Sequence, residues 1–312
     1  MSYADCRKSS DNSHVIIAKD ALDQLEKIGL NRDGILAGMV ETSVPESKGC
    51  WAGSAGDFDG QKVSVGIAQW NFGQGTLQPL LKKYKQSYSN NELFEFEVTK
   101  VMPTYWRNIF DKGCLNSKVT KQCSDFLKLQ QSGKGKLNEA FKSEIDALFE
   151  SETMIQLQAD EYIRLLGSVK DSLKRLFPDA APVGIQIKWA IDTKIQQGKF
   201  AGDEDIKRIR NKWISSSVEG KKRTLLGTIK WYEGLCETLD QDGIKYDVDY
   251  NVKAWSALVN KNVVSETQSD LILLSFLRSR VSDGKGGLYQ ADTFQRRLKI
   301  ILGVGSVHGR RE

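Results

Sequence analysis

The stretch that decides the fold runs over residues 41–79, and its central part, residues 56–71, reads GDFDGQKVSVGIAQWN. Glu41 follows a short apolar segment, and Asp59 comes eighteen residues later in a polar loop flanked by glycines. Ser64 lies five residues after Asp59, just before a glycine-containing turn. Hydrolysis of a glycosidic bond requires two carboxyl groups on opposite sides of a sugar ring. The stretch therefore predicts a glycoside hydrolase site.

Glu41 lies where a carboxyl group is expected to hold its proton. A helix that ends just before it is predicted by the apolar residues Ile35, Leu36, Met39 and Val40. The negative end of a helix raises the pKa of a nearby carboxyl group, and a general acid needs such a raised pKa. Taken singly, however, most glutamates at helix ends are exposed surface residues.

The composition is that of an ordinary globular protein, with 312 residues, of which 40% are apolar and 27% charged. There is no run of 18 apolar residues, so we expect no membrane span. The first residues lack the apolar core of a secretory signal peptide. The chain would therefore stay in the cytoplasm, leave by a route that needs no cleaved signal, or be released by lysis. With the function expected below, we expect export by a signal-independent route and activity in the periplasm of a target cell.

The net charge of +5 indicates weak attraction to polyanions. No basic block carries interleaved aromatic residues, so we do not expect a nucleic-acid partner. A hydrolase of chitosan, a polycation, needs an acidic groove, whereas the carboxylates of peptidoglycan suit a basic protein. Basic residues also follow the central stretch, namely Lys82, Lys83, Lys85 and Arg107.

No metal or other cofactor is expected. The chain has five cysteines and two histidines without a Cys-x-x-Cys pair, which argues against zinc. The segment Asp57–Gly60 is similar to the start of a calcium loop but lacks its later ligands. Cys114 and Cys123 bracket a polar loop and could pair in an oxidising space, with unpaired thiols as the equal alternative.

The spacing of apolar residues predicts a mostly α protein of the α+β class with a small β element. Alternation at Val63, Val65 and Ile67 predicts a short strand or the entry to a buried helix. Aromatic residues within 244–260 favour a small turn or strand. Helices are expected over residues 16–29, 137–177, 183–197, 203–215, 219–238, 266–281 and 290–302, from residue 77, and as short segments between 91 and 131.

We interpret residues 1–312 as one catalytic domain with two lobes. The run Ser132–Lys136 contains two glycines and is the best candidate for a flexible boundary. The lobes would cover about residues 15–131 and 137–312.

These motifs resemble the lysozyme-like superfamily, most closely the family 46 chitosanases and the phage lysozymes. In that group a glutamate at a helix end is followed by a hairpin aspartate, a hydroxyl residue and a Gly-Ile turn. The resemblance implies a two-lobed fold with a small β-hairpin beside the active-site cleft. It also implies an inverting mechanism in which Glu41 donates a proton, Asp59 activates water and Ser64 holds that water.

Two further resemblances point to peptidoglycan. Glu41–Ser43 with Gly66–Gln69 is similar to motifs of the soluble lytic transglycosylases. Residues 69–80, 189–198 and 303–309 are similar to peptidoglycan-active proteins of phages and of type VI secretion systems. The lysine- and serine-rich insert at 44–56 departs from the family pattern.

The remaining candidate residues would bind substrate. Asp57 is a loop residue and the alternative base. Gln69 and Asn71 are neutral donors and acceptors suited to sugar N-acetyl and hydroxyl groups. Trp70 and Trp51 could stack on sugar rings. The plainer alternatives are that Asp57 forms a turn, that Trp70 is a core residue and that Asn71 is a cap.

We therefore expect a muramidase that cleaves the glycan strands of the bacterial cell wall, as an antibacterial effector (a toxin) or a phage lytic enzyme. Its partners would be those strands and an immunity or inhibitor protein. The alternatives are a chitosanase and a non-catalytic module that binds the cell wall. The sequence leaves open which glycosidic bond is cut, and whether water or an intramolecular hydroxyl completes the reaction.

Overall fold

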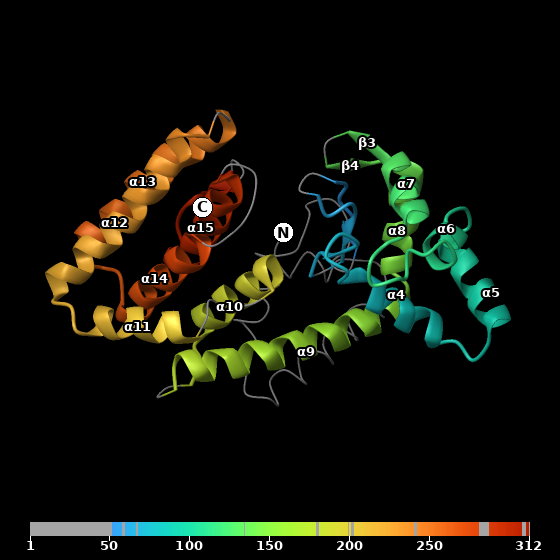
Figure 1. Ribbon diagram of the computed structural model, residues 1–312, viewed down its shortest axis with the longest axis horizontal. Coiled ribbons are helices and arrows are strands. Elements are labelled where there is room, and N and C mark those ends of the chain that lie inside the picture. The colour runs from blue at the N-terminus through green and yellow to red at the C-terminus, as the bar shows by residue number, and fades with distance from the viewer. Residues whose placement is uncertain are drawn as a thin grey trace. The chain divides into compact units, whose positions relative to one another are not determined.

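The computed structural model describes residues 52–57, 60–66, 68–133, 135–178, 181–198, 200, 203–239, 242–280, 287–307 and 310–311. In these ranges the chain is mostly helical, with three two-stranded antiparallel sheets (Figure 1). The mostly α prediction is confirmed for this part of the chain. The helices expected over 16–29 and just before Glu41 lie outside the described residues.

The chain divides into two compact units, Met1–Asp171 (unit 1) and Ser172–Glu312 (unit 2). The division falls within helix α9, Glu152–Leu176. The boundary expected at residues 132–136 lies inside unit 1 instead, where the chain forms the β3–β4 hairpin. That both units belong to one catalytic domain stays a prediction.

Unit 1 holds two small hairpins and several short helices ahead of α9. They are β1 (Ser64–Val65), β2 (Trp70–Asn71), α4 (Leu77–Gln86), α5 (Asn91–Val101), α6 (Trp106–Phe110), α7 (Lys121–Leu129), β3 (Gln131–Gly133), β4 (Lys136–Leu137) and α8 (Glu139–Phe149).

Polar caps determine where these helices begin. The side chains of Asn90, Thr120 and Asn138 accept hydrogen bonds from backbone N–H groups in the first turns of α5, α7 and α8. The single helix predicted over 137–177 is therefore wrong: the structure has α8 and α9, with a break at residues 150–151. There the Ser151 Oγ donates to the Leu148 carbonyl (2.7 Å), a side-chain contact that competes with helical hydrogen bonding.

The core of unit 1 is rich in aromatic side chains. The Phe94 ring lies edge-on to Trp106 and Phe110, with ring centroids 5.9 and 5.0 Å apart. Tyr84 of α4 packs on the same rings and is almost fully buried. Such edge-to-face pairs add to the gain from burial alone. They join α4, α5 and α6 into the support on which the β1–β2 hairpin rests.

Unit 2 is a helical unit with a short hairpin at its end. It contains α10 (Gly184–Gln197), α11 (Asp203–Ile214), α12 (Val218–Glu237), α13 (Asp242–Asn260), α14 (Glu266–Arg280), α15 (Leu288–Leu302), β5 (Ser306–Val307) and β6 (Arg310–Arg311). Helix α14 packs along α15, and α12 packs along α13 (Figure 1). The predicted helix over 183–197 ends as expected at Gly198, which has a φ of 68°.

The turn or strand predicted within 244–260 is wrong, because these residues form α13. Their described buried members are Asp247, Val248, Asn251, Trp255 and Val259, and Asp247, Asn251, Trp255 and Val259 follow one another at intervals of four residues. This is the helical period. The strand preference of the aromatic residues is overridden by packing of this face against the rest of unit 2.

A buried ion cluster joins α10 to α15. Asp192 is fully buried, and its Oδ1 accepts from Arg296 Nη2 (3.0 Å) while its Oδ2 accepts from Arg297 Nε (3.3 Å). Arg297 Nη2 also donates to the Gln197 Oε1 (2.8 Å). Burial lowers the pKa of the Arg297 guanidinium to about 10 although Asp192 opposes this, so the group is still charged at neutral pH. One carboxylate therefore pairs with two arginines, of which Arg297 is fully buried.

We expect the substitution Asp192→Asn to lower the free energy of unfolding of unit 2 by about 3–5 kcal/mol, because it leaves a buried guanidinium without its counter-charge. Urea unfolding followed by circular dichroism measures this. The matched control is Asp249→Asn at an exposed position of α13, which should stay within about 0.5 kcal/mol of the parent chain. An equal change in the free energy of unfolding for the two variants would contradict the role of Asp192 as the counter-charge of the buried arginines.

Candidate functional site

The described part of the predicted site is the segment of residues 52–76, which we call the site hairpin. It contains Ser64, Gln69, Trp70 and Asn71 on or between β1 and β2, and Asp57 in the preceding loop. Three predicted residues, Glu41, Trp51 and Asp59, lie outside the described residues. The distance between the two proposed catalytic carboxyl groups therefore stays a prediction.

Strand β1 is the centre of the site hairpin. Ser64 pairs with Asn71 of β2 on one side and forms a bridge with Ala55 on the other. Val63 and Val65 on either side of it are fully buried. The strand alternative for this segment is thus confirmed over Ser64–Val65. The N–H and the carbonyl of Ser64 both bond to Ala55, and on the β2 side the Phe72 N–H donates to the Val63 carbonyl (3.2 Å), so the backbone of β1 is held on both edges.

The turn between the strands is tight and strained. The Gln69 N–H donates to the Gly66 carbonyl (3.0 Å), and Gly66 has a φ of 83°. Gln69 has a φ of 50°, which is uncommon for a residue with a side chain. Its Nε2 donates to the carbonyls of Gly66 (3.0 Å) and Gly53 (3.2 Å). Both amide hydrogens are thereby used, and the Oε1 is the atom left to accept from a ligand.

Trp70 has two roles open to it. Its ring lies directly over Gly66, because a Cβ at that glycine would lie 3.0 Å from the ring carbons Cε3 and Cζ3. The side chain also packs against the core of unit 1, yet it is only partly buried. The core alternative therefore accounts for part of the ring, and the remainder is accessible for stacking.

Asn71 organises the turn that precedes α4. Its Oδ1 accepts from the Gln74 N–H (2.7 Å), and its own N–H donates to the Thr76 Oγ1 (2.8 Å). The Asn71 carbonyl accepts from the Thr76 N–H (3.1 Å). The buried amide thus shapes the turn before α4 but does not cap that helix, whose N-cap is Thr76. Its role in sugar binding stays a prediction.

Asp57 likewise forms a turn. Its Oδ1 accepts from the Gly60 N–H (2.7 Å), so this carboxylate closes the loop that contains Asp59. The Asp57 N–H donates to the Gln131 Oε1 (2.8 Å), and the Gly56 N–H donates to the Gly135 carbonyl (3.1 Å). The loop is therefore fixed to the β3–β4 hairpin, while the Asp57 side chain itself stays exposed.

Two buried residues that are not among the predicted site residues lie against the site hairpin. Asp146 of α8 is one of them. Its Oδ1 accepts from the Ser54 N–H (2.9 Å) and hydroxyl (2.6 Å), and its Oδ2 accepts from Lys142 Nζ (2.5 Å). An acid between Ile145 and Phe149 on the apolar face of a helix was the signal that could have identified it.

Gln158 of α9 is the second. It is fully buried, and its Nε2 donates to the Phe149 carbonyl (2.9 Å). A Cβ on Gly66 would come within 2.5 Å of the Gln158 Oε1. The turn therefore lies against both Gln158 and Trp70, and only a glycine fits between them.

Glu161 of α9 cannot replace Glu41 as a proton donor. Burial would raise its pKa, but ion pairs with Lys83 and Arg164 outweigh burial and hold the pKa below its usual range. A general acid needs the opposite shift. Glu161 is therefore a charged partner that ties α9 to α4.

Neither a metal site nor a membrane helix is found in the described ranges. No three His, Cys, Asp or Glu side chains there come together as they would around a metal ion. None of the helices in this part of the chain has the length and apolar character needed to cross a bilayer.

Comparison of the chain with protein-family models, curated proteins and solved structures finds no match.

We expect Gly66→Ala to destabilise unit 1 more than Gly60→Ala does. Both glycines have positive φ, so an alanine at either position should cost about 1 kcal/mol or more in backbone strain. A Cβ at Gly60 meets no atom within 4 Å, whereas one at Gly66 meets Gln158 and Trp70. Gly66→Ala should therefore cost roughly 1–3 kcal/mol more.

Thermal unfolding of the two variants measures the difference. Equal melting temperatures would show that the turn can move away from Gln158 and Trp70, and would contradict the packing described here.

Proposed function

We propose that this protein is a peptidoglycan glycoside hydrolase, a muramidase with a lysozyme-like two-lobed fold and the site hairpin beside its cleft. The observation that carries the proposal is the arrangement of β1 and its preceding loop. Asp59 lies between Asp57 and Gly60, which are joined by a hydrogen bond, and Ser64 follows on a strand held at both edges. In this proposal the acid and the hydroxyl act from one short stretch of sequence, of which the described residues Asp57, Gly60 and Ser64 are held by these contacts.

Such tethering suits an inverting mechanism. There Glu41 protonates the glycosidic oxygen, and Asp59 removes a proton from a water that Ser64 holds. The two carboxyl groups must lie about 6.5–9.5 Å apart to leave room for this water. Catalytic groups must be held to within about 0.5 Å of the productive geometry. The Asp57–Gly60 contact and the bond from Asp57 N–H to Gln131 supply this support for the loop.

The β1–β2 turn supplies the sugar contacts in this proposal. The Gln69 Oε1 accepts from a hydroxyl or an N-acetyl N–H, since the amide nitrogen is already committed to two carbonyls. The accessible part of the Trp70 ring stacks on a sugar face. Trp51 contributes a second stacking surface in the same proposal.

Charge favours peptidoglycan as the substrate. The net charge is +5, and Lys82 is exposed on α4, the helix that follows the site hairpin. A basic surface attracts the carboxylates of peptidoglycan and repels polycationic chitosan. In this proposal the protein acts in the periplasm of a target bacterium, as an exported antibacterial effector or a phage lytic enzyme, and an immunity protein protects the producing cell.

A non-catalytic module that binds the cell wall is the second candidate. The observation that favours it is that Asp57 and Asn71 use their side chains to shape turns. Binding to purified sacculi without release of soluble muropeptides would identify this candidate.

We expect Glu41→Gln to lower the rate of sacculus digestion by about 10²–10⁴-fold, because the amide cannot donate the proton that the leaving oxygen needs. Release of soluble muropeptides, followed by mass spectrometry, measures the rate. Circular dichroism should show an unchanged fold. Full activity of this variant would refute the assignment. A reducing end on the products would indicate hydrolysis, and an anhydro end would indicate lytic transglycosylation.

Asp59→Asn and Asp57→Asn form a matched pair that identifies the base. An asparagine at position 57 still offers an oxygen to the Gly60 N–H, so the loop should persist and most activity should remain. Asp59→Asn should remove most activity. A far larger loss in Asp57→Asn than in Asp59→Asn would instead make Asp57 the base.

A further inference from the structure

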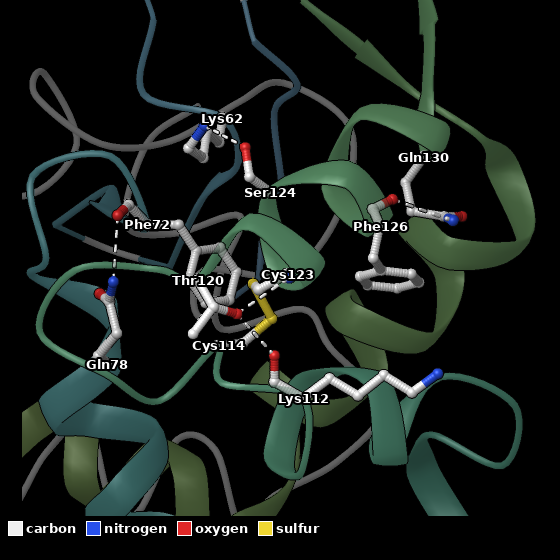
Figure 2. The surroundings of a disulfide bond; sticks show 10 residues. All are labelled: Lys62, Phe72, Gln78, Lys112, Cys114, Thr120, Cys123, Ser124, Phe126 and Gln130. Atoms are coloured by element: carbon white, nitrogen blue, oxygen red, sulfur yellow. Dashed lines mark hydrogen bonds between the residues drawn. A yellow bond between two sulfur atoms is a disulfide. The ribbon is translucent and has the colours of Figure 1, made fainter.

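A disulfide joins Cys114 and Cys123 in unit 1, and both residues are fully buried (Figure 2). We call residues 114–123 the disulfide loop. It leads into α7, whose N-cap Thr120 accepts from the Cys123 N–H (3.3 Å). The Thr120 Oγ1 also donates to the Lys112 carbonyl (3.1 Å). The covalent bond therefore fixes the start of α7 against the chain before it.

The disulfide loop and α7 contact the site hairpin on both of its limbs, which we define as residues 60–65 (the first limb) and residues 70–76 (the second limb). Beside the second limb, the Ser117 carbonyl lies only 2.8 Å from the position that a Cβ on Gly75 would occupy. On the first limb, Lys62 Nζ donates to the Ser124 Oγ (3.0 Å; Figure 2). Gln131, just beyond α7, donates from its Nε2 to the Lys62 carbonyl (3.3 Å).

Few backbone hydrogen bonds define the disulfide loop itself. Asn116 and Thr120 both donate from their N–H groups to the Gly113 carbonyl at 3.4 Å, which is long for such bonds. A loop of this kind keeps one conformation chiefly because its ends are joined, since the cross-link removes open conformations from the ensemble. Without the S–S bond, the segment that supports the site hairpin would be free to open.

We propose that the Cys114–Cys123 disulfide is an oxidation-dependent latch that holds the site hairpin in its functional position. On closing, the two thiols lose two protons and two electrons and form the S–S bond. A disulfide oxidant takes up both and leaves as two thiols. Thiols stay reduced in the cytoplasm and pair in oxidising spaces such as the periplasm. That the latch controls lysis rests on the proposed function; that it orders the hairpin does not.

Because the disulfide is buried, it should resist reduction once it has formed. Exchange requires a thiolate to reach a sulfur of the bond, and both cysteines are fully buried, so the closed latch resists small reductants. The described free thiol, Cys236 of unit 2, does not compete for pairing. Burial raises its pKa to about 12, so it is not a thiolate at neutral pH.

The test compares the oxidised protein with the double variant Cys114→Ala, Cys123→Ala by hydrogen exchange and mass spectrometry. We expect exchange at residues 60–66 and 71–76 to become at least about tenfold faster. Helices α8 and α14 are the internal references and should not change. Unchanged exchange in the site hairpin, or an equal rise along α8, would overturn the latch.

A second variant keeps the disulfide and tests one of its contacts. Ser124→Ala removes the acceptor for Lys62 Nζ, and we expect it to speed exchange at residues 60–66 while leaving 71–76 unchanged. Faster exchange over the whole of unit 1 would instead show general loosening and contradict a local latch.

Sacculus digestion separates this proposal from the proposed function. With the latch and the hydrolase both correct, the double variant digests sacculi at least about tenfold more slowly than the oxidised protein. If neither protein digests sacculi while their exchange differs as expected, the hydrolase proposal fails and the latch stands. If the two proteins digest sacculi at the same rate and exchange hydrogen at the same rate, the latch proposal fails and the hydrolase proposal stands.

Discussion

The site hairpin depends on the absence of a side chain at Gly66. The chain reverses direction there between β1 and β2, with Trp70 packed over one side and the buried Gln158 against the other. A Cβ at Gly66 would lie 2.5 Å from the Gln158 Oε1 and 3.0 Å from the Trp70 ring, so the turn or these side chains would have to move. The pairing of Val65 with Trp70 lies directly beside this close approach.

The parts of the fold that could be predicted are those determined by the spacing of apolar residues along a short stretch of sequence. The helix over 183–197 and its stop at Gly198 follow from apolar periodicity and a single glycine. The failures come from tertiary context. Tyr250 and Trp255 favour strands in isolation, but both lie in α13, where Trp255 follows the buried Asn251 at helical spacing. At the break between α8 and α9 the Ser151 hydroxyl donates to the Leu148 carbonyl, a contact that apolar periodicity does not report.

The candidate site divides in the same way. Ser64, Gln69, Trp70 and Asn71 are neighbours in sequence, so their association was predictable, but which of their side chains shape the turns was not. An amide looks the same in the sequence whether it meets a sugar or a backbone N–H. Asp146 stands out as an acid on an apolar helix face, but its partner in the hairpin could not be predicted, because Ser54 and Asp146 are 92 positions apart. No local pattern connects an acid on α8 to a loop so distant in the chain.

The buried cluster of Asp192, Arg296 and Arg297 shows that residues of a motif that resembles functional proteins can have a structural role. Residues 189–192 resemble a segment of proteins that act on the cell wall, yet Trp189 donates to the Ser275 hydroxyl in the core and Asp192 pairs with two arginines. We expect these side chains to change together, since a chain that loses the carboxylate leaves a buried cation without a counter-charge. Paired change at positions 192 and 297 should therefore mark distant relatives of unit 2 after general sequence similarity has faded.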